Sequence, residues 1–338
     1  MKRNLWLCCI IALMCGTFAM SCSKEASKTE TSASEPRTVI AAHTGNERTT
    51  YQVGMEAFKR EVERLSEGRF KVDIYPSTLG GDKELMESLQ IGTVDFAEVN
   101  TSVLASIVPE LGIFDLPYLF ISREHAYEVF DGEVGDTLLG KVRDKAGITP
   151  IAYWENGFRC FTNNVRPITK PEDLKALKMR SMQSNIHLTA YRLWGADPTP
   201  MSISEMVTAM QQGVIQGHDN NIDTVVANSM WEYQKYFTES WHFYGSKVLA
   251  FSNQFWNSLS DEDKVVFTQA VETARDVERA ECASRYGVSL ETLSKNGMQI
   301  THKDEVLTEA FVESVQPVWD SYVKQYGDAL IQKINALK

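Results

Sequence analysis

Hydrophobic residues in the first third of the chain follow two spacings in turn, one typical of strands and one typical of helices. Short apolar strands are expected at 38–42, 70–75 and 94–99, and amphipathic helices at 51–66 and 82–90. A helix therefore follows each of the first two strands. This order is typical of a doubly wound α/β domain, in which helices cover a largely parallel sheet.

The middle of the chain predicts a passage into a second domain. We expect an apolar loop at 113–120 and a strand at 148–153. Asn156-Gly157 then predicts a turn, because both residue types accept the backbone angles of tight turns. The crossing between domains is expected at this turn.

The stretch 173–221 predicts two strands joined by helices. A strand is expected at 177–182 and a helix at 185–194, followed by a rigid proline-rich turn at 197–200. A second strand is expected at 213–217. Two strands with a helical crossover predict a parallel pair, whose carboxyl ends meet at one edge of the sheet.

Three polar signals lie within that stretch. Ser202 and Glu205 have the spacing of a capping box, which predicts a helix that runs to Gln212. Arg180 and Asn220 each lie at or just past a strand's carboxyl end. Ligands bind at that edge in open α/β sheets.

The last third of the chain predicts a return to the first domain. A helix is expected at 224–236, an aromatic run stands at 241–244, and a strand is expected at 247–252. Helical spacing then persists over 261–296, with a break at Gly287. At 1.5 Å per residue a helix of about 30 residues is about 45 Å long, enough to bridge two domains.

The amino terminus predicts a targeting segment at 1–21, with Lys2 and Arg3 before an apolar run of signal-peptide length. The run ends at Ala19-Met20-Ser21-Cys22, which resembles a bacterial lipoprotein box. We expect Cys22 to be acylated and 22–37 to be a flexible tether rich in Ser, Thr, Glu and Lys. The alternative is ordinary secretion, with Cys22 merely near the cleavage site.

Composition and charge exclude several functions. The net charge is −11 without a basic run, which argues against nucleic acid as a partner. Phosphate-binding glycine motifs and nucleophile elbows are missing, and the six histidines show no metal spacing. We therefore expect no catalytic residue, no metal and no cofactor. His218 and Asp219 are interpreted as solvated loop residues. Cys160 and Cys282 are interpreted as buried free thiols, with a disulfide between them as the alternative.

Arg180 is the strongest candidate for a binding residue. It interrupts an apolar strand, and a buried arginine needs an anion or hydrogen-bond acceptors because burying an unpaired charge is costly. Its planar guanidinium suits a carboxylate bidentately. The residues alone leave two alternatives open, a ligand carboxylate and an intramolecular salt bridge.

Seven motifs in order resemble the periplasmic solute-binding subunit of tripartite ATP-independent periplasmic (TRAP) transporters. The resemblance covers nearly the whole chain after the targeting segment. The motifs are Tyr75-Pro76-Ser77 with Leu79-Gly80-Gly81-Asp82, Gln90 to Phe96, Phe114 to Tyr118, Asn156 to Arg159, Asp173 to Arg180, Gly195 to Met201, and Ser204-Glu205 continuing to Asn220.

The resemblance implies an α/β, two-domain periplasmic-binding-protein fold. Each domain would have a central β-sheet flanked by helices, with strands crossing between domains and a long kinked helix spanning both. On this basis we expect domain I at 38–156 and 246–285, and domain II at 157–245 and 286–338. The family closes around its ligand at a hinge.

The resemblance also implies roles for individual residues. Arg180 matches the arginine that forms the salt bridge with the ligand carboxylate. Arg159 and Asn220 match further polar contacts near that carboxylate, and Asn100 matches a ligand-facing position at a strand end. Ile203 stands where an aromatic residue often walls the pocket.

Several residues of this chain differ from the family pattern, and these differences bear on the chemical character of the ligand's body. Asn100 replaces an acid found in some members, and Ser181-Met182-Gln183 and 217–221 differ from common versions. These changes favour a monocarboxylate with an apolar body over a sugar acid. Trp154 is a candidate apolar wall, as is the aromatic run 241–244, and core packing is the alternative for each.

The function implied is that of a substrate-binding protein in the periplasm, lipid-anchored to a bacterial membrane through Cys22. It would capture a small organic acid and deliver it to the TRAP membrane permease subunits, with an accessory periplasmic protein as a further candidate partner. The alternative is a ligand-sensing or scaffolding lipoprotein of the same fold without a transport role. An enzyme is not expected.

Overall fold

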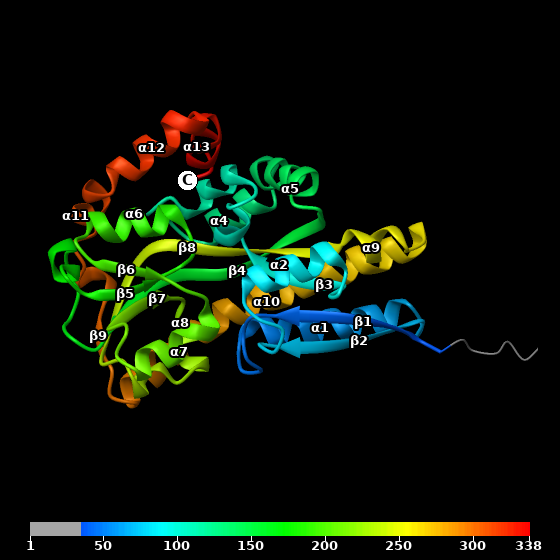
Figure 1. Cartoon of the computed structure of the whole chain (residues 1–338), viewed down its shortest axis with the longest axis horizontal. Coiled ribbons are helices and arrows are strands. Elements are labelled where there is room, and N and C mark those ends of the chain that lie inside the picture. Colours follow the sequence, from blue (N-terminus) through cyan, green and yellow to red (C-terminus); the bar gives the residue numbers. More distant parts are fainter. Residues whose placement is uncertain (1–34) are drawn as a thin grey trace, which may run out of the picture. The chain divides into compact units, whose positions relative to one another are not determined.

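The computed structural model describes residues 35–338, so the expected signal segment, Cys22 and most of the tether lie outside the described residues. Residues 36–338 form one compact unit around a nine-stranded sheet with the order β2-β1-β3-β8-β4-β7-β5-β6, and β9 pairs with β8 (Figure 1). The strands are β1 (Arg37–His43), β2 (Phe70–Pro76), β3 (Phe96–Asn100), β4 (Ile148–Asn163), β5 (Lys178–Ser181), β6 (Asp197–Pro200), β7 (Gly217–Asn220), β8 (Tyr236–Ser252) and β9 (Gln299–Thr301).

Helices flank this sheet. The α-helices are α1 (Thr50–Leu65), α2 (Asp82–Ile91), α3 (Thr101–Leu104), α4 (Arg123–Phe130), α5 (Glu133–Lys145), α6 (Asn185–Leu193), α7 (Ile203–Gln211), α8 (Ile222–Ala227), α9 (Asn253–Asn257), α10 (Asp261–Lys295), α11 (Thr308–Ser314), α12 (Gln316–Tyr326) and α13 (Ala329–Asn335). The 3₁₀-helices are η1 (Pro109–Asp115), η2 (Pro171–Leu174), η3 (Met230–Glu232) and η4 (Lys303–Glu305). Within residues 35–338 no helix is both long and apolar enough to cross a membrane.

The doubly wound beginning is confirmed. β1 pairs in parallel with both β2 and β3, and α1 and α2 are the crossover helices. α1 is helical because its apolar residues recur on one face, and that face buries Met55, Phe58 and Val62. Phe58 stacks on Phe96 of β3, with ring centroids 4.1 Å apart. The strand ends therefore meet at one edge of the sheet.

The prediction of a turn at Asn156-Gly157 is wrong. β4 continues through both residues and pairs with the 17-residue β8 over its whole length. The register shifts between Glu155 and Gly157, and Gly157 has a φ of 88°. A β-bulge with glycine at positive φ bends a strand without ending it, which explains the misleading turn signal. β8 likewise joins the aromatic run and the strand expected at 247–252.

The stretch 173–221 has the expected parallel pair, with Met179 opposite Gly217 and Arg180 opposite His218. The second strand of this pair lies later in the chain than expected. The sequence predicted a strand that ends at Gly217, whereas β7 begins there. The proline-rich turn is instead the edge strand β6. Proline is tolerated at an edge because its missing N–H is not needed by a further strand.

Other boundaries in the second half also differ from expectation. The capping box at Ser202 is confirmed, since the Glu205 carboxylate accepts from the Ser202 backbone N–H at 2.9 Å. The prediction of one helix at 224–236 is wrong in its length. The structure has two short helices there, α8 and η3, before β8 begins. The apolar loop at 113–120 begins within η1, and its apolar side chains are buried apart from the half-buried Tyr118.

The long helix is confirmed as α10, which has 35 residues and runs through Gly287, so the break expected there is wrong. Ser260 caps its start by accepting from the Asp263 N–H at 3.1 Å. α10 packs against α1, β4 and α8 (Figure 1). Cys160 and Cys282 are both free thiols, as expected, although only Cys160 is fully buried.

A buried carboxyl group lies where α10, α1 and β4 meet. Glu278 accepts hydrogen bonds from the Thr50 hydroxyl at 3.1 Å, the Cys282 thiol at 2.9 Å and the Glu155 backbone N–H at 3.2 Å. Burial and the nearby Glu155 carboxylate raise the pKa of Glu278 to about 8. Glu155 itself pairs with Arg123 at 2.8 Å and accepts from the Tyr127 hydroxyl.

We predict that Glu278→Gln flattens the pH dependence of stability. Between 4.5, the ordinary pKa of a glutamate side chain, and about 8, the unfolded state releases a proton that the folded state keeps, so the free energy of unfolding falls as pH rises. The neutral amide removes this loss. Urea unfolding at pH 5 and at pH 8 measures this effect. Between these two pH values, the free energy of unfolding of the variant relative to that of wild type should increase by on the order of 1–3 kcal/mol. Glu272→Gln, an exposed acid on the same helix, is the control, and equal slopes for all three proteins would refute the assignment.

Candidate functional site

A cavity of about 210 Å³ lies at the strand edge that the sequence singled out. It is lined by residues from the β1–α1 connection, from the ends of β3, β5 and β7, from β4 and β8, and from α7 and α8. They are Thr44, Gly45, Asn46, Thr49, Tyr51, Ser77, Asp82, Asn100, Asn156, Arg159, Arg180, Met182, Ile203, Ser204, Val207, Asn220, Thr224, Asn228 and Lys247. Amide and hydroxyl side chains predominate, with a small apolar group and three cations.

Arg180 is buried in this cavity without a carboxylate partner among residues 35–338. Its Nε donates to the Met201 carbonyl at 2.9 Å, and its buried Nη1 has no hydrogen-bond partner. Burial, followed by repulsion from Arg159, lowers the pKa of Arg180 to about 10. The intramolecular salt bridge that the sequence left open is therefore not formed. A guanidinium with an unused donor is set up to receive an anion.

Arg159 is also buried, but its charge is compensated. Its Nε contacts Asp219 Oδ2 at 2.5 Å, and its Nη2 donates to the Asp219 carbonyl at 2.6 Å. Its Nη1 donates to Asn220 Oδ1 at 3.4 Å. The Asn220 Oδ1 is thus occupied, and its Nδ2 makes no hydrogen bond within the described residues. Arg159 consequently orients Asn220 so that an N–H donor is available to a ligand.

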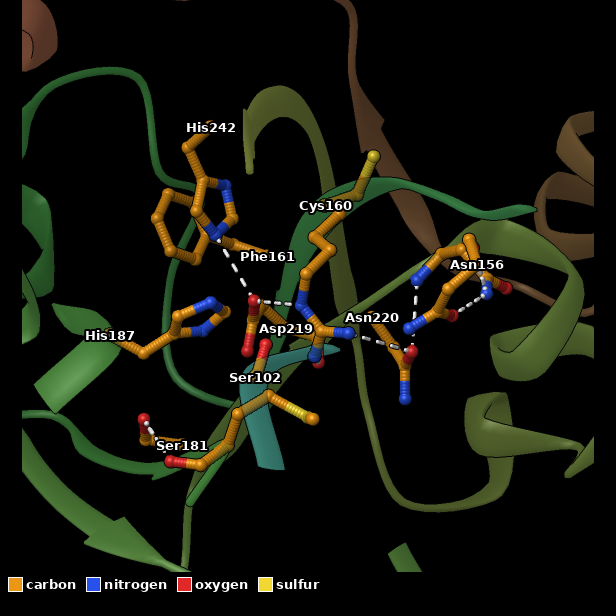
Figure 2. A network of polar contacts seen from close by, with 12 residues as sticks. Ser102, Asn156, Cys160, Phe161, Ser181, His187, Asp219, Asn220 and His242 are labelled. Carbon is orange, nitrogen blue, oxygen red and sulfur yellow. Dashed lines mark hydrogen bonds and ion pairs between the residues drawn. The ribbon is translucent and has the colours of Figure 1, made fainter. Parts of the chain in front are cut away.

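The interpretation of His218 and Asp219 as solvated loop residues is wrong. Both are fully buried in β7, which pairs with β4 on one side and β5 on the other. His242 Nε2 lies 3.3 Å from Asp219 Oδ2, and Figure 2 shows Asp219 between His242 and Asn220. Burial alone would raise the pKa of Asp219, but Arg159 and His242 lower it well below its usual value. Asp219 is therefore a structural counter-ion.

Five of the predicted pocket residues lie in the cavity, namely Arg180, Arg159, Asn220, Asn100 and Ile203. Trp154 does not, and its expected role as a pocket wall is corrected. It is fully buried on the α1 side of the sheet, where a Cβ on Gly54 would lie 2.7 Å from its ring. β4 thus supplies Trp154 to the core, and Asn156 and Arg159 to the cavity.

The aromatic run on β8 also belongs to the core. Trp241 stacks on Phe158 at 4.4 Å and Phe243 stacks on His187 at 3.9 Å between ring centroids. Tyr244 is buried among aromatic side chains. None of these residues lines the described cavity. The packing alternative is thus correct for all of them.

Sequence reasoning missed Lys247, the third buried cation in the cavity. Its Nζ contacts Glu98 Oε2 at 2.5 Å and Asp82 Oδ1 at 3.4 Å, and donates to Thr44 Oγ1 at 2.8 Å. It also lies 4.7 Å above the Tyr51 ring. The signal was present, because Lys247 directly precedes an apolar strand segment just as Arg180 interrupts one. Lys247 is fully engaged by carboxylates, unlike Arg180.

The site therefore offers one unpaired cation, several neutral donors and acceptors, and a small apolar surface. The Asn100 Oδ1 accepts from the Ser102 N–H at 3.0 Å, which leaves its amide nitrogen for the cavity. Among residues 35–338 no group of three or more His, Cys, Asp or Glu side chains is arranged to hold a metal ion. The arrangement can bind an anion with a polar body.

The chain is similar to known solute-binding proteins. The family described as bacterial extracellular solute-binding protein, family 7, matches residues 41–325. A solute-binding protein of Verminephrobacter eiseniae is 32% identical over 285 residues, which are 84% of each chain.

Two solved structures are similar over nearly their whole length. A TRAP periplasmic solute-binding protein from Polaromonas sp. JS666, bound to D-erythronate, has 36% identity and a TM-score of 0.86 over 89% of this chain and 99% of that one. Another from Bordetella, with density interpreted as pantoate, has 37% identity and a TM-score of 0.86 with the same coverage.

The two buried arginines should respond in opposite ways to removal of their charge. Arg159→Met leaves Asp219 buried without its partner, so we expect a loss of about 3–5 kcal/mol in the free energy of unfolding. Arg180→Met removes a charge that has no carboxylate partner. We expect that variant to lie within about 1 kcal/mol of wild type or to be more stable.

Urea unfolding of the ligand-free proteins would measure this contrast. Each substitution has the same size and chemistry, so each variant is the other's control. Equal destabilisation by the two substitutions would show that Arg180 is also a structural ion-pair residue.

Proposed function

Because the chain belongs to family 7 of the bacterial extracellular solute-binding proteins, we propose that it binds a small hydroxylated monocarboxylate and delivers it to the membrane permease of a TRAP transporter. The observation that carries this proposal is the buried Arg180 guanidinium, whose Nη1 has no partner. A carboxylate would satisfy it with short, charge-assisted hydrogen bonds.

The charges lining the cavity favour one carboxylate rather than two. Arg159 is neutralised by Asp219, and Lys247 lies between Asp82 and Glu98. Arg180 is the cation lining the cavity that has no carboxylate within ion-pair distance in the described residues. A second carboxylate near Lys247 would be repelled by the acids already there.

The lining favours a more polar ligand body than the apolar one expected from the sequence. Met182, Ile203 and Val207 supply the apolar surface, whereas asparagine amides and hydroxyls supply most of the rest. A wholly apolar body would leave those polar groups without partners, which is costly. We therefore favour a hydroxylated acid that keeps one apolar side. The ligands in the Polaromonas and Bordetella proteins, D-erythronate and pantoate, are hydroxylated monocarboxylates of this kind.

We further propose that binding closes two lobes, 38–156 with 246–285 and 157–245 with 286–338. Both lobes line the cavity, with Asn100 and Lys247 from the first and Arg180 and Asn220 from the second. Asn46 Nδ2 also donates to the Ala227 carbonyl at 3.0 Å, which joins the lobes beside the cavity. A ligand that contacts both lobes shifts the population toward the closed state.

Attachment to a membrane through a lipid on Cys22 completes the proposal. The support is the sequence, in which Ala19-Met20-Ser21 precedes the cysteine and a polar tether follows it. A tether would keep the binding protein close to the permease and raise its effective concentration there.

Ligand binding should depend on Arg180 and on the ligand's charge. We expect Arg180→Met to weaken binding of D-erythronate and pantoate at least about 100-fold in isothermal titration calorimetry, because a charge-assisted interaction of about 3 kcal/mol is lost. Arg180→Lys should fall between that variant and wild type, because lysine keeps the charge but not the fork. Equal affinity of wild-type protein for an acid and its uncharged amide would contradict the anchor.

Lipid attachment has a separate test. Cys22→Ser should move the protein from the membrane fraction of the producing bacterium to the soluble extracytoplasmic fraction, and should abolish incorporation of labelled palmitate. Cys160→Ser, which alters a buried thiol elsewhere, is the control. Membrane retention of the Cys22→Ser protein would refute the anchor without affecting the ligand assignment.

A further inference from the structure

A second cavity, of about 450 Å³, is lined by residues that lie next in sequence to residues of the ligand cavity. It is bordered by α3 and η1 on one side and by α6 and α12 on the other. The residues that line it are Ser102, Ala105, Ser106, Pro109, Gly112, Gln183, Ser184, Asn185, Ile186, Thr189, Val318, Ser321, Tyr322, Gln325 and Tyr326. None of them carries a charge, so the space suits a neutral polar group.

Two separate chain segments contribute residues to both cavities. In the first segment Asn100 lines the ligand cavity and Ser102 lines the second cavity. In the other segment Met182 lines the ligand cavity, whereas Gln183 and Ser184 line the second cavity. The segments 100–102 and 182–184, hereafter the partition, therefore present one side to each cavity.

One buried carboxylate fastens the two halves of the partition together. Asp115 Oδ1 accepts from the Ser102 hydroxyl at 2.5 Å, and Asp115 Oδ2 accepts from the Ser184 hydroxyl at 2.8 Å. His187 Nε2 lies 3.3 Å from the same carboxylate. Asp115 is 3% exposed, and although burial would raise its pKa, His187 and the two serines hold it below its usual value. The partition is thus held by a buried anion from η1.

Within the partition, the Met182 side chain can be shortened without removing either hydrogen bond to Asp115. Its side chain is apolar, 6% exposed, and lies two residues beyond the anion anchor Arg180. Ser181 and Ser184 hold the backbone on either side, through hydrogen bonds to the Met182 carbonyl and to Asp115. A methionine side chain at such a point fills space and has little polar function.

We propose that the partition sets the upper size limit of the ligand, and that Met182 closes the opening between the two cavities. This inference rests on the proposed function, because it concerns the body of the same carboxylate ligand. With the thioether in place, an acid must fit the ligand cavity. With the thioether removed, a neutral polar substituent on the acid extends into the second cavity, where hydroxyl and amide side chains receive it.

The test compares acids that share one head group. Gluconate is the short acid, and lactobionate, which is gluconate bearing a neutral galactosyl substituent, is the long one. Affinities of the wild-type chain, Met182→Ala and Val207→Ala are measured by calorimetry. Val207→Ala is the matched control, because Val207 is an apolar residue of the ligand cavity that lies outside the partition.

We expect Met182→Ala to improve the affinity for lactobionate relative to gluconate at least 10-fold, and Val207→Ala to leave that ratio unchanged. Ser184→Ala, which loosens the partition without trimming it, should shift the ratio in the same direction by a smaller factor. A purely structural role of these residues would weaken both acids equally.

An unchanged ratio in Met182→Ala, or the same shift in Val207→Ala, would overturn the size limit while leaving the proposed function intact. If Met182→Ala does not fold, the Ser184→Ala ratio decides in the same way. Failure of the wild-type protein to bind any acid of the series, D-erythronate and pantoate included, would instead refute the proposed function and the size limit with it.

Discussion

The burial of two arginines on neighbouring segments, one paired and one unpaired, is the constraint from which the site follows. Arg159 is held by the Asp219 carboxylate and carbonyl, and this pair ties β4 to β7. Arg180 lies on the adjoining β5 and carries its charge without a carboxylate. Burying an unpaired charge costs free energy, and the packing of the rest of the sheet offsets that cost. An anion that neutralises Arg180 removes the cost, and this favours binding of the anion.

The long strands β4 and β8 pass through both proposed lobes and border the cavity. β4 and β8 run through the sheet as a continuous antiparallel pair, and bulges rather than turns bend them between the lobes (Figure 1). Arg159 and Lys247 lie on these two strands. A carboxylate bound at Arg180 is therefore positioned against parts of the molecule that are connected by the same strands. In the closure proposed above, this shared backbone would link ligand contacts to movement of the lobes.

The sequence predicted the regular elements well because hydrophobic spacing encodes which face is buried. β1, α1, β2, α2, β5, α6 and α10 lie within a few residues of expectation. The prediction failed where one local sequence signal is compatible with two different structures in the folded protein. Asn156-Gly157 fits a turn and equally a bulge, and 197–200 fits a turn and equally an edge strand. Pairing with a distant strand decides between such outcomes, and hydrophobic spacing along the chain contains no record of it.

The same distinction applies to the site. Arg180 could be identified because a charge in an apolar strand is unusual by itself, and Lys247 carried the same signal. The aromatic candidates failed because an apolar side chain on a two-faced sheet can serve the core or the cavity, and Trp154 faces the core. The residues alone could not predict which cation remains unpaired, and only the family resemblance favoured Arg180. Asp82, Asp219 and Glu98 are far from their partners in sequence, and only the folded sheet shows that they neutralise Lys247 and Arg159 but leave Arg180 open. An acidic chain can therefore bind an acid, because the local balance of charge inside the cavity, rather than the total of −11, determines what enters it.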